Sequence, residues 1–217
     1  MIKALNIEKS YNGEKVLKSV SIEASQGDFI SIMGESGSGK STFLSILGGF
    51  LDADGGDVFW NGVNIKDYDE NQIAAIRCKD VGFVFQSFKL IPTLNIRDNI
   101  LLPLTLGGSL DGEALKYVDW LTDSLEIGHL MKKFPAQLSG GQCQRVAIAR
   151  ALAYKPSAVI LDEPTGALDS VMEEKVMNLL SEINREQNTT IIQVTHSKRV
   201  AEYAGRIILL KDGEILS

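Results

Sequence analysis

The sequence predicts an α/β domain with a mainly parallel β-sheet, because helix-like and strand-like stretches alternate along its 217 residues. Two apolar runs, 28–33 and 158–161, each end directly before glycine or acidic residues. Strands of an open α/β sheet end in this way, with the ligand-binding residues just beyond their carboxyl ends. A chain of this length folds as one or two domains and needs no disulfides to complete its core.

The remaining elements follow from hydrophobic spacing and turn residues. Further strands are expected at 20–24, 57–60, 81–85 and 190–195, and a hairpin at 207–216. Asn61-Gly62 after 57–60 is a pair that favours a tight hairpin turn. The middle of the chain, from about Asn95 to Tyr154, is expected to be mostly helical, and an amphipathic helix is expected between 158–161 and 190–195.

Composition narrows the class of function. The net charge of −6 argues against a general nucleic-acid binder, whose affinity comes mostly from basic side chains on phosphates. Cys78 and Cys143 have no metal-type spacing and are expected to be reduced thiols. The N-terminus has no signal-peptide pattern, and no apolar run approaches the roughly 20 residues of a membrane span. We therefore expect a soluble, cytosolic chain.

A phosphate-binding loop follows the expected strand 28–33. Its sequence fits the pattern GxxxxGK[ST] and precedes an apolar helix. Glycines let backbone N–H groups surround phosphate oxygens, the lysine supplies a positive charge, and the final hydroxyl can bind Mg²⁺. The expected nucleotide contacts are Gly34, Glu35, Ser36, Gly37, Ser38, Gly39, Lys40, Ser41 and Thr42.

Two acids follow the apolar run 158–161. Asp162 is placed to hold Mg²⁺ through water, and Glu163, one residue further, to polarise an attacking water. A solvated acidic turn is the alternative for this pair taken alone. Together with the phosphate loop, the pair indicates hydrolysis of a nucleoside triphosphate, which requires a metal and an oriented water.

A second anion site is expected where Ser139 and two glycines begin a helix. Two phosphate sites allow two nucleotides in one chain, or one nucleotide shared between two chains. The segment Leu138–Leu152 closely resembles the signature motif and helix of ATP-binding cassette (ABC) ATPases. That resemblance implies sharing: two copies pair head to tail, and the signature residues Ser139, Gly140, Gly141 and Gln142 cap the ATP of the other copy.

The resemblance extends over nearly the whole chain and implies a fold and a ligand. The fold is a RecA-like core with a mainly parallel sheet, an antiparallel β subdomain and an α-helical subdomain at about 87–154. Residues 1–217 would form a single ABC ATPase domain. ATP and Mg²⁺ are the implied ligands, and hydrolysis to ADP and phosphate is the implied reaction.

Other family motifs match in order. Tyr11 matches the aromatic residue that stacks on adenine, although an ordinary strand tyrosine is the alternative. Gln86 matches the glutamine that touches Mg²⁺ after a strand, so Ser41, Gln86 and Asp162 form the implied metal site. Lys40, Gln86, Glu163 and His196 are the implied catalytic residues, with His196 contacting the γ-phosphate.

Two positions depart from the family pattern. Gly166 replaces the usual serine at the start of a loop, called the D-loop, that ends in Asp169, an implied ATP-site residue. Cys143 replaces a common glutamine, and an oxidation-sensitive thiol is a minor alternative there. His129 has no motif context and is expected to be a surface residue.

The segments 83–94 and 99–104 resemble one branch of the family, which serves lipoprotein release, macrolide export and antimicrobial-peptide resistance. Gly166 and the run 99–104 favour the peptide-resistance members. The implied partners are a second copy and a separate membrane permease, without nucleic acid, which would hold the chain on the inner face of the cell membrane. An exposed apolar loop at Leu90–Leu94 is the expected permease contact.

The sequence leaves alternative functions open. A regulatory ATPase of a cell-division-type permease complex is the nearest, and the sequence separates it poorly from export. Soluble ABC ATPases acting on DNA or ribosomes carry long insertions or two cassettes per chain, which this sequence does not have. The signature segment argues against a simple P-loop kinase.

Overall fold

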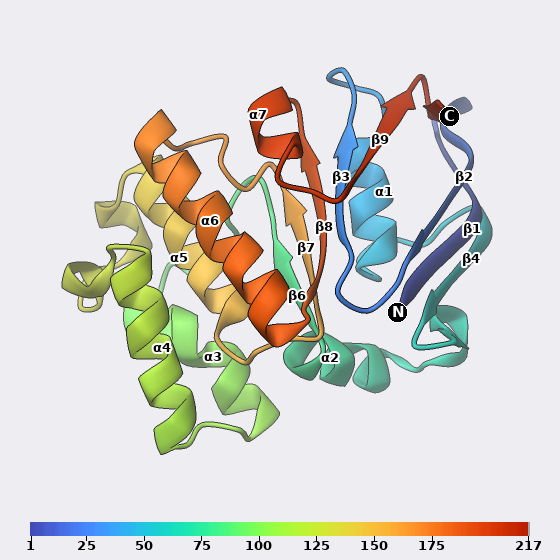
Figure 1. Ribbon diagram of the computed structural model, residues 1–217. Helices are drawn as coiled ribbons and strands as arrows, with labels where there is room; N and C mark the ends of the chain where they lie inside the picture. The colour runs from blue at the N-terminus through green and yellow to red at the C-terminus, as the bar shows by residue number, and fades with distance from the viewer. Residues whose placement is uncertain (217) are drawn as a thin grey trace.

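The computed structural model describes residues 1–216 and arranges them around two β-sheets (Figure 1). The first sheet is antiparallel, with strand order β2-β1-β4-β5. Its strands are β1 (Ile2–Tyr11), β2 (Glu14–Ala24), β4 (Gly55–Trp60) and β5 (Val63–Asn64). It corresponds to the expected antiparallel part of the fold.

The second sheet has the order β10-β9-β3-β8-β7-β6 and is parallel except for β10. Its strands are β3 (Phe29–Met33), β6 (Val81–Val84), β7 (Ala158–Asp162), β8 (Thr190–Thr195), β9 (Arg206–Lys211) and β10 (Glu214–Leu216). The α/β class with a mainly parallel core sheet is therefore confirmed.

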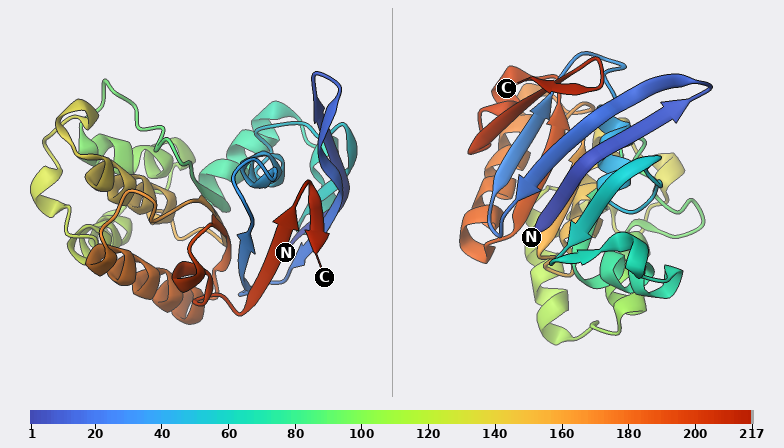
Figure 2. Two further views of the ribbon diagram at one scale, coloured as in Figure 1. Left: turned by 90° about the horizontal axis from the view of Figure 1, so that it is seen from above. Right: turned by 90° about the vertical axis from the view of Figure 1, so that its right-hand side faces the viewer.

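Helices cover both faces of the parallel sheet. The helix of residues 40–47 lies between the two sheets, and the helices within residues 96–187 gather on the opposite side of the parallel sheet (Figures 1 and 2). The helix of residues 70–79 packs Ile73 and Ile76 against the same core as the helix of residues 40–47. The α-helices are α1 (Lys40–Leu47), α2 (Glu70–Lys79), α3 (Ile96–Gly107), α4 (Gly112–Ser124), α5 (Gly140–Leu152), α6 (Ser170–Gln187) and α7 (Lys198–Ala201). Three short 3-10 turns, Ile65–Asp67, Gly128–Leu130 and Pro135–Gln137, complete the chain.

The apolar run of strand β7 contributes side chains to two hydrophobic cores. Val159 and Leu161 point to the core formed with α3, α4, α5 and α6, whereas Ala158 and Ile160 point to the core around α1. Successive side chains of a strand face opposite sides of its sheet. A continuous apolar run is therefore required wherever both faces are covered.

Strand β1 and helix α2 were not predicted from the sequence, and neither were the short elements β5 and α7. Strand β1 has a left-handed residue at Asn6 (φ 50°) and shifts in register with β2, which interrupt its alternation. Helix α2 has no fully buried residue, and only Ile73 and Ile76 pack, partly buried, against the core, which is too short an apolar pattern to indicate a helix. Asp69 and Gln72 instead form a capping box at its start. By contrast, the turns at Asn61-Gly62 and Asp212-Gly213 have left-handed residues at both positions, as expected for tight hairpins.

Within residues 1–216, no helix is long and apolar enough to cross a membrane.

A substitution at Gly82 on β6 tests the packing of α5 against the sheet. A Cβ at Gly82 would lie 2.4 Å from the carbonyl oxygen of Ala151 at the end of α5. Gly82→Ala should therefore destabilise the fold by roughly 1–3 kcal/mol, because backbone must move to admit the methyl group. Urea unfolding followed by circular dichroism measures this. Gly112→Ala is the control, because within residues 1–216 only the chain neighbours and the backbone of its own helix lie within 4 Å of that Cβ position.

Candidate active site

Four parallel strands bring the predicted motifs to one edge of the sheet. The phosphate loop follows β3, Gln86 follows β6, Glu163 follows β7 and His196 follows β8. Because β3, β8, β7 and β6 are neighbours and run parallel, their carboxyl ends lie together. Ligands of open α/β sheets bind at this edge.

Glycines allow the phosphate loop to pack closely against strand β2 of the antiparallel sheet and strand β9 of the parallel sheet. Gly37 and Gly39 have φ values of 84° and 97°, which suit glycine best. A Cβ at Gly39 would lie 2.8 Å from the Leu17 side chain and 2.9 Å from the Val16 carbonyl oxygen. At Gly34, a Cβ would lie 2.1 Å from the carbonyl oxygen of Leu210. The loop conformation therefore depends on these glycines.

The loop curls around the Lys40 ammonium group. Lys40 is 9% exposed, and its Nζ donates to the carbonyl oxygens of Gly34 (2.8 Å) and Glu35 (2.6 Å). The Ser38 hydroxyl is buried and has no hydrogen-bond partner among residues 1–216. A buried, unpartnered hydroxyl beside a cation at the N-terminus of α1 fits a phosphate group.

Asp162 ends β7 and connects it to the phosphate loop. Its Oδ1 accepts a hydrogen bond from the Ser41 hydroxyl at 3.1 Å. The carboxylate is 7% exposed. Burial raises the pKa of Asp162 above its ordinary value, while the Ser41 hydrogen bond and the Lys40 charge act in the opposite direction. Oxygen donors of this kind suit Mg²⁺, so Ser41, Asp162 and the nearby Gln86 amide fit the predicted metal site.

Glu163, directly after Asp162, has a left-handed backbone (φ 50°). Such a conformation costs a non-glycine residue roughly 1–3 kcal/mol and is concentrated at functional sites. The backbone N–H of Glu163 donates to Val194, and its Oε1 lies 3.0 Å from His196 Nδ1. A carboxylate only accepts hydrogen bonds, so this contact places the imidazole proton on Nδ1. The Glu163 side chain is 13% exposed, whereas the His196 side chain is 74% exposed.

A cleft of about 590 Å³ joins these groups. It is lined by Tyr11, Val16, Ser36, Gly37, Gly39, Lys40, Ser41, Thr42, Gln86, Glu163, Val194 and His196. Tyr11 is 46% exposed, so its ring is accessible to a base. Sequence reasoning missed Val16 and Val194. Val16 belongs to the alternating pattern of β2, which could have indicated it.

The signature residues are outside this cleft. Ser139 caps α5 and forms a capping box with Gln142, with hydrogen bonds of 3.3 and 3.0 Å. A Cβ at Gly141 would lie 2.9 Å from the carbonyl oxygen of Ala167, so this helix start packs against the D-loop. Asp169 also lies outside the cleft lining, and its carboxylate caps α6. The two anion sites that the sequence predicts are therefore separate within one chain.

Cys143, next to the signature, is half-buried. Burial raises the pKa of its thiol, which disfavours the reactive thiolate. The alternative of an oxidation-sensitive thiol therefore receives no support from its surroundings.

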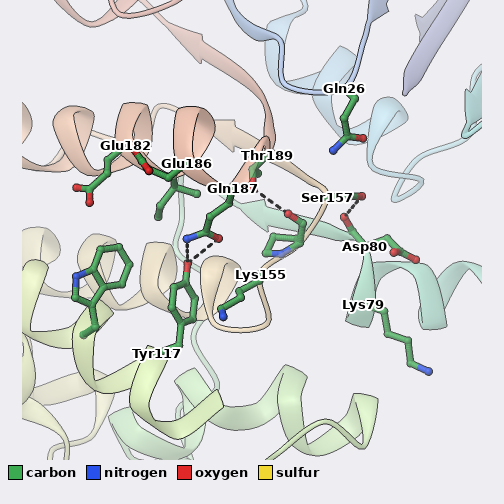
Figure 3. A pocket seen from close by; sticks show the side chains of 13 residues that line it. Gln26, Lys79, Asp80, Tyr117, Lys155, Ser157, Glu182, Glu186, Gln187 and Thr189 are labelled. Carbon is green, nitrogen blue, oxygen red and sulfur yellow. Dashed lines mark hydrogen bonds between the residues drawn. The ribbon is translucent and has the colours of Figure 1, made fainter. Parts of the chain in front are cut away.

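A larger hollow, of about 740 Å³, lies beside the segments that precede β7 and β8 (Figure 3). The Tyr117 hydroxyl and the Gln187 amide exchange hydrogen bonds of 3.2 and 3.0 Å there, and Lys155 Nζ lies 4.8 Å from the Tyr117 ring centroid. These segments precede the strands, whereas the phosphate loop follows one. We therefore assign the nucleotide to the smaller cleft.

The fold and the cleft define a nucleotide-hydrolysing enzyme of the phosphate-loop class. The sequence profile of the ABC transporter family matches residues 17–166. The chain belongs to this family: it is an ABC ATPase, with ATP and Mg²⁺ as the ligands of its site.

Relatives of known name agree along the full length. An ABC transporter ATP-binding protein of Methanocaldococcus jannaschii, MJ0796, is 45% identical over 99% of this chain and 95% of its own length. The lipoprotein-releasing system ATP-binding protein LolD of Aquifex aeolicus is 42% identical over 100% of this chain and 96% of its own length. The macrolide export ATP-binding/permease protein MacB of Syntrophobacter fumaroxidans is 41% identical over 99% of this chain but only 31% of that longer protein. These relatives fit the predicted branch.

Solved structures agree with the fold. The dimeric structure of the MJ0796 cassette in a post-hydrolysis state, bound to ADP and phosphate, matches with a TM-score of 0.94 at 42% identity. The match covers 100% of this chain and 97% of that one.

The buried carboxylate of Asp162 predicts a dependence of stability on pH. Because its folded pKa is raised, the ionised carboxylate is disfavoured in the folded state, and it reduces stability as pH rises through that pKa. Asp162→Asn keeps an acceptor for Ser41 and removes the charge. At pH 7, without nucleotide or metal, this variant should melt at a higher temperature than the parent. The difference in melting temperature should disappear below about pH 4, where Asp162 of the parent is protonated in both the folded and the unfolded state.

Asp57→Asn is the control for this melting experiment. Hydrogen bonds from Asn64 and Lys66 lower the pKa of Asp57, so this variant should not gain stability at pH 7. An Asp162→Asn protein that melts at or below the parent temperature at pH 7 would contradict the assignment of a destabilising buried charge.

Proposed function

We propose that this chain is the ATPase subunit of a membrane transporter and works as a head-to-tail pair. The observation that carries the proposal is the separation of Ser139 and Gly141 from the cleft that holds Lys40 and Glu163. A phosphate-binding helix start without its own nucleotide cleft is explained if it completes the site of a second copy. The dimeric structure of the MJ0796 cassette supports the pairing of two copies.

In the proposed mechanism, Lys40 and the amides of the phosphate loop hold the β- and γ-phosphates, and Tyr11 stacks on adenine. Ser41 and Gln86 would hold Mg²⁺ directly and Asp162 through water, and the ion would neutralise charge on the phosphate oxygens.

Glu163 orients the attacking water, and His196, which it contacts, stabilises the γ-phosphate. Ser139 and Gly141 of the second copy complete the site. Hydrolysis then weakens the pair, because the shared nucleotide forms part of its interface.

We also propose that the pair drives a separate permease from the inner face of the cell membrane. Residues 1–217 would act as one domain, with a helical subdomain at about 87–154. Transport would fall among macrolide export, antimicrobial-peptide resistance and lipoprotein release, which the names of MacB and LolD and the branch resemblance support.

The expected permease contact at Leu90–Leu94 needs correction. Leu90, Ile91 and Leu94 are half-buried, and Phe88 and Leu90 pack against the helical core. The reason is a buried asparagine on α3: Asn99 accepts from the backbone N–H of Ile91 and donates to the Ile91 and Leu94 carbonyls. The backbone is thereby drawn onto the helices, and the loop is not an exposed apolar surface.

An aromatic cluster beside Gln86 is a better candidate for the permease contact. Phe50 is 43% exposed, and its ring centroid lies 4.9 Å from that of Phe83 and 5.1 Å from that of Phe85. Arg77 lies 4.6 Å above the Phe50 ring. Aromatic and arginine side chains are enriched in protein interfaces, so we propose that Phe50, Phe83 and Phe85 form the docking surface.

Glu163→Gln tests the catalytic assignment. The amide can still contact ligands but cannot accept a proton from water, so kcat should fall by at least about 100-fold. ATP binding should persist, and the variant should elute as a dimer with ATP on a sizing column. Hydrolysis at the parent rate would remove Glu163 from this role.

Phe50→Ala tests the docking surface. Loss of the ring should reduce the permease recovered with the tagged ATPase by about tenfold, equivalent to ~1.4 kcal/mol, and leave ATP hydrolysis by the isolated chain unchanged. Trp120→Ala is the matched control, because Trp120 is also exposed and packs on another aromatic ring, Tyr117, on helix α4. Equal recovery of the permease with both variants would contradict the proposed surface.

A further inference from the structure

Arg150, near the end of α5, makes contacts that the proposed mechanism does not use. Its two terminal nitrogens donate to the backbone carbonyl oxygens of Lys89 (2.7 Å) and Phe88 (2.8 Å). No carboxylate of residues 1–216 forms a salt bridge with it. Burial lowers the pKa of the guanidinium, but an arginine remains charged at neutral pH. The half-buried guanidinium of Arg150 therefore holds the main chain at Phe88 and Lys89.

The main chain that Arg150 holds is strained. Phe88 and Lys89 have φ values of 61° and 49°, and both are non-glycine residues in the left-handed region. Two consecutive residues of this kind need an external contact to persist. The planar guanidinium presents two N–H groups in a fixed fork, which suits two neighbouring carbonyl oxygens. A lysine at this position could not reproduce that geometry.

The side chain of Phe88 lies next to the start of the signature helix. The Cζ atom of the Phe88 ring lies 4.0 Å from a Cβ position built on Gly140, next to Ser139. Phe88 is also only two residues beyond Gln86, which lines the ATP cleft. The ring therefore joins the segment that leaves the cleft to the helix start that is proposed to cap the partner's ATP.

We propose that Arg150 is a positioning residue: it holds the Phe88–Lys89 turn so that the Phe88 ring supports Gly140 and Ser139 in a pairing-competent position relative to Gln86. This inference rests on the proposed head-to-tail pair. Arg150 touches neither nucleotide nor metal in this arrangement. Its loss should weaken pairing with ATP and leave the binding of nucleotide to a single chain intact.

The test uses the full chain in the Glu163→Gln background, with ATP-dependent dimerisation measured by sedimentation over a range of protein concentrations. Arg150→Met should raise the dimer dissociation constant by about tenfold, because two charge-assisted hydrogen bonds are lost. Arg150→Lys should recover only part of the loss. The affinity for ADP should stay within about twofold of the parent, since the phosphate loop is unaffected. Amide hydrogen exchange of 87–91 should become faster in Arg150→Met.

Arg206→Met is the control, because Arg206 also donates to a main-chain carbonyl, that of Glu23, far from α5 in sequence. Phe88→Leu provides a second variant that keeps Arg150 but shortens the reach to Gly140, and it should weaken pairing in the same way. Parent-like pairing of both Arg150→Met and Phe88→Leu would overturn the inference. A Glu163→Gln parent that does not pair with ATP would instead overturn the proposed function, and the inference with it.

Discussion

The hydrogen bond between Ser41 and Asp162 joins the start of α1 to the end of β7, and the geometry of the site depends on that junction. It becomes possible because β3 and β7 are both parallel to β8, so that their carboxyl ends lie at the same edge. Burial makes the carboxylate costly to ionise there, which is tolerable where a cation is to bind. The phosphate loop, the acids and His196 thus form one cleft because of sheet topology.

The same topology is the basis of the proposed pairing of two chains. The signature begins α5, and its helix start packs against the D-loop instead of facing the cleft. The segment after Gln86 connects the two regions, with Asn99 holding one end and Arg150 the other. In the proposed pair this segment would link the γ-phosphate site to the signature, and an exposed aromatic surface at Phe50 lies beside it in the fold.

Local patterns predicted the parts of the fold that depend on local physics. The loop Gly34–Ser41, the acids after β7 and the hairpin turns were recognisable because glycine, lysine and turn residues have strict backbone requirements. Strand β1 was missed because Asn6 interrupts its alternation, and α2 because only Ile73 and Ile76 face the core and both are only partly buried. Asn99 holds the backbone at Ile91 and Leu94, and Arg150 holds the Phe88–Lys89 turn. No sequence pattern indicates either contact.

The central claim is that each ATP site combines residues of two chains. Mixing two inactive variants tests it directly: Lys40→Met has no working phosphate loop, and Ser139→Arg has no working signature. In a mixed pair, the intact loop of one chain would meet the intact signature of the other. The account predicts that ATPase activity returns on mixing, to about one quarter of the parent if half of the pairs are mixed and each has one intact site. A mixture as inactive as its separate components would contradict it.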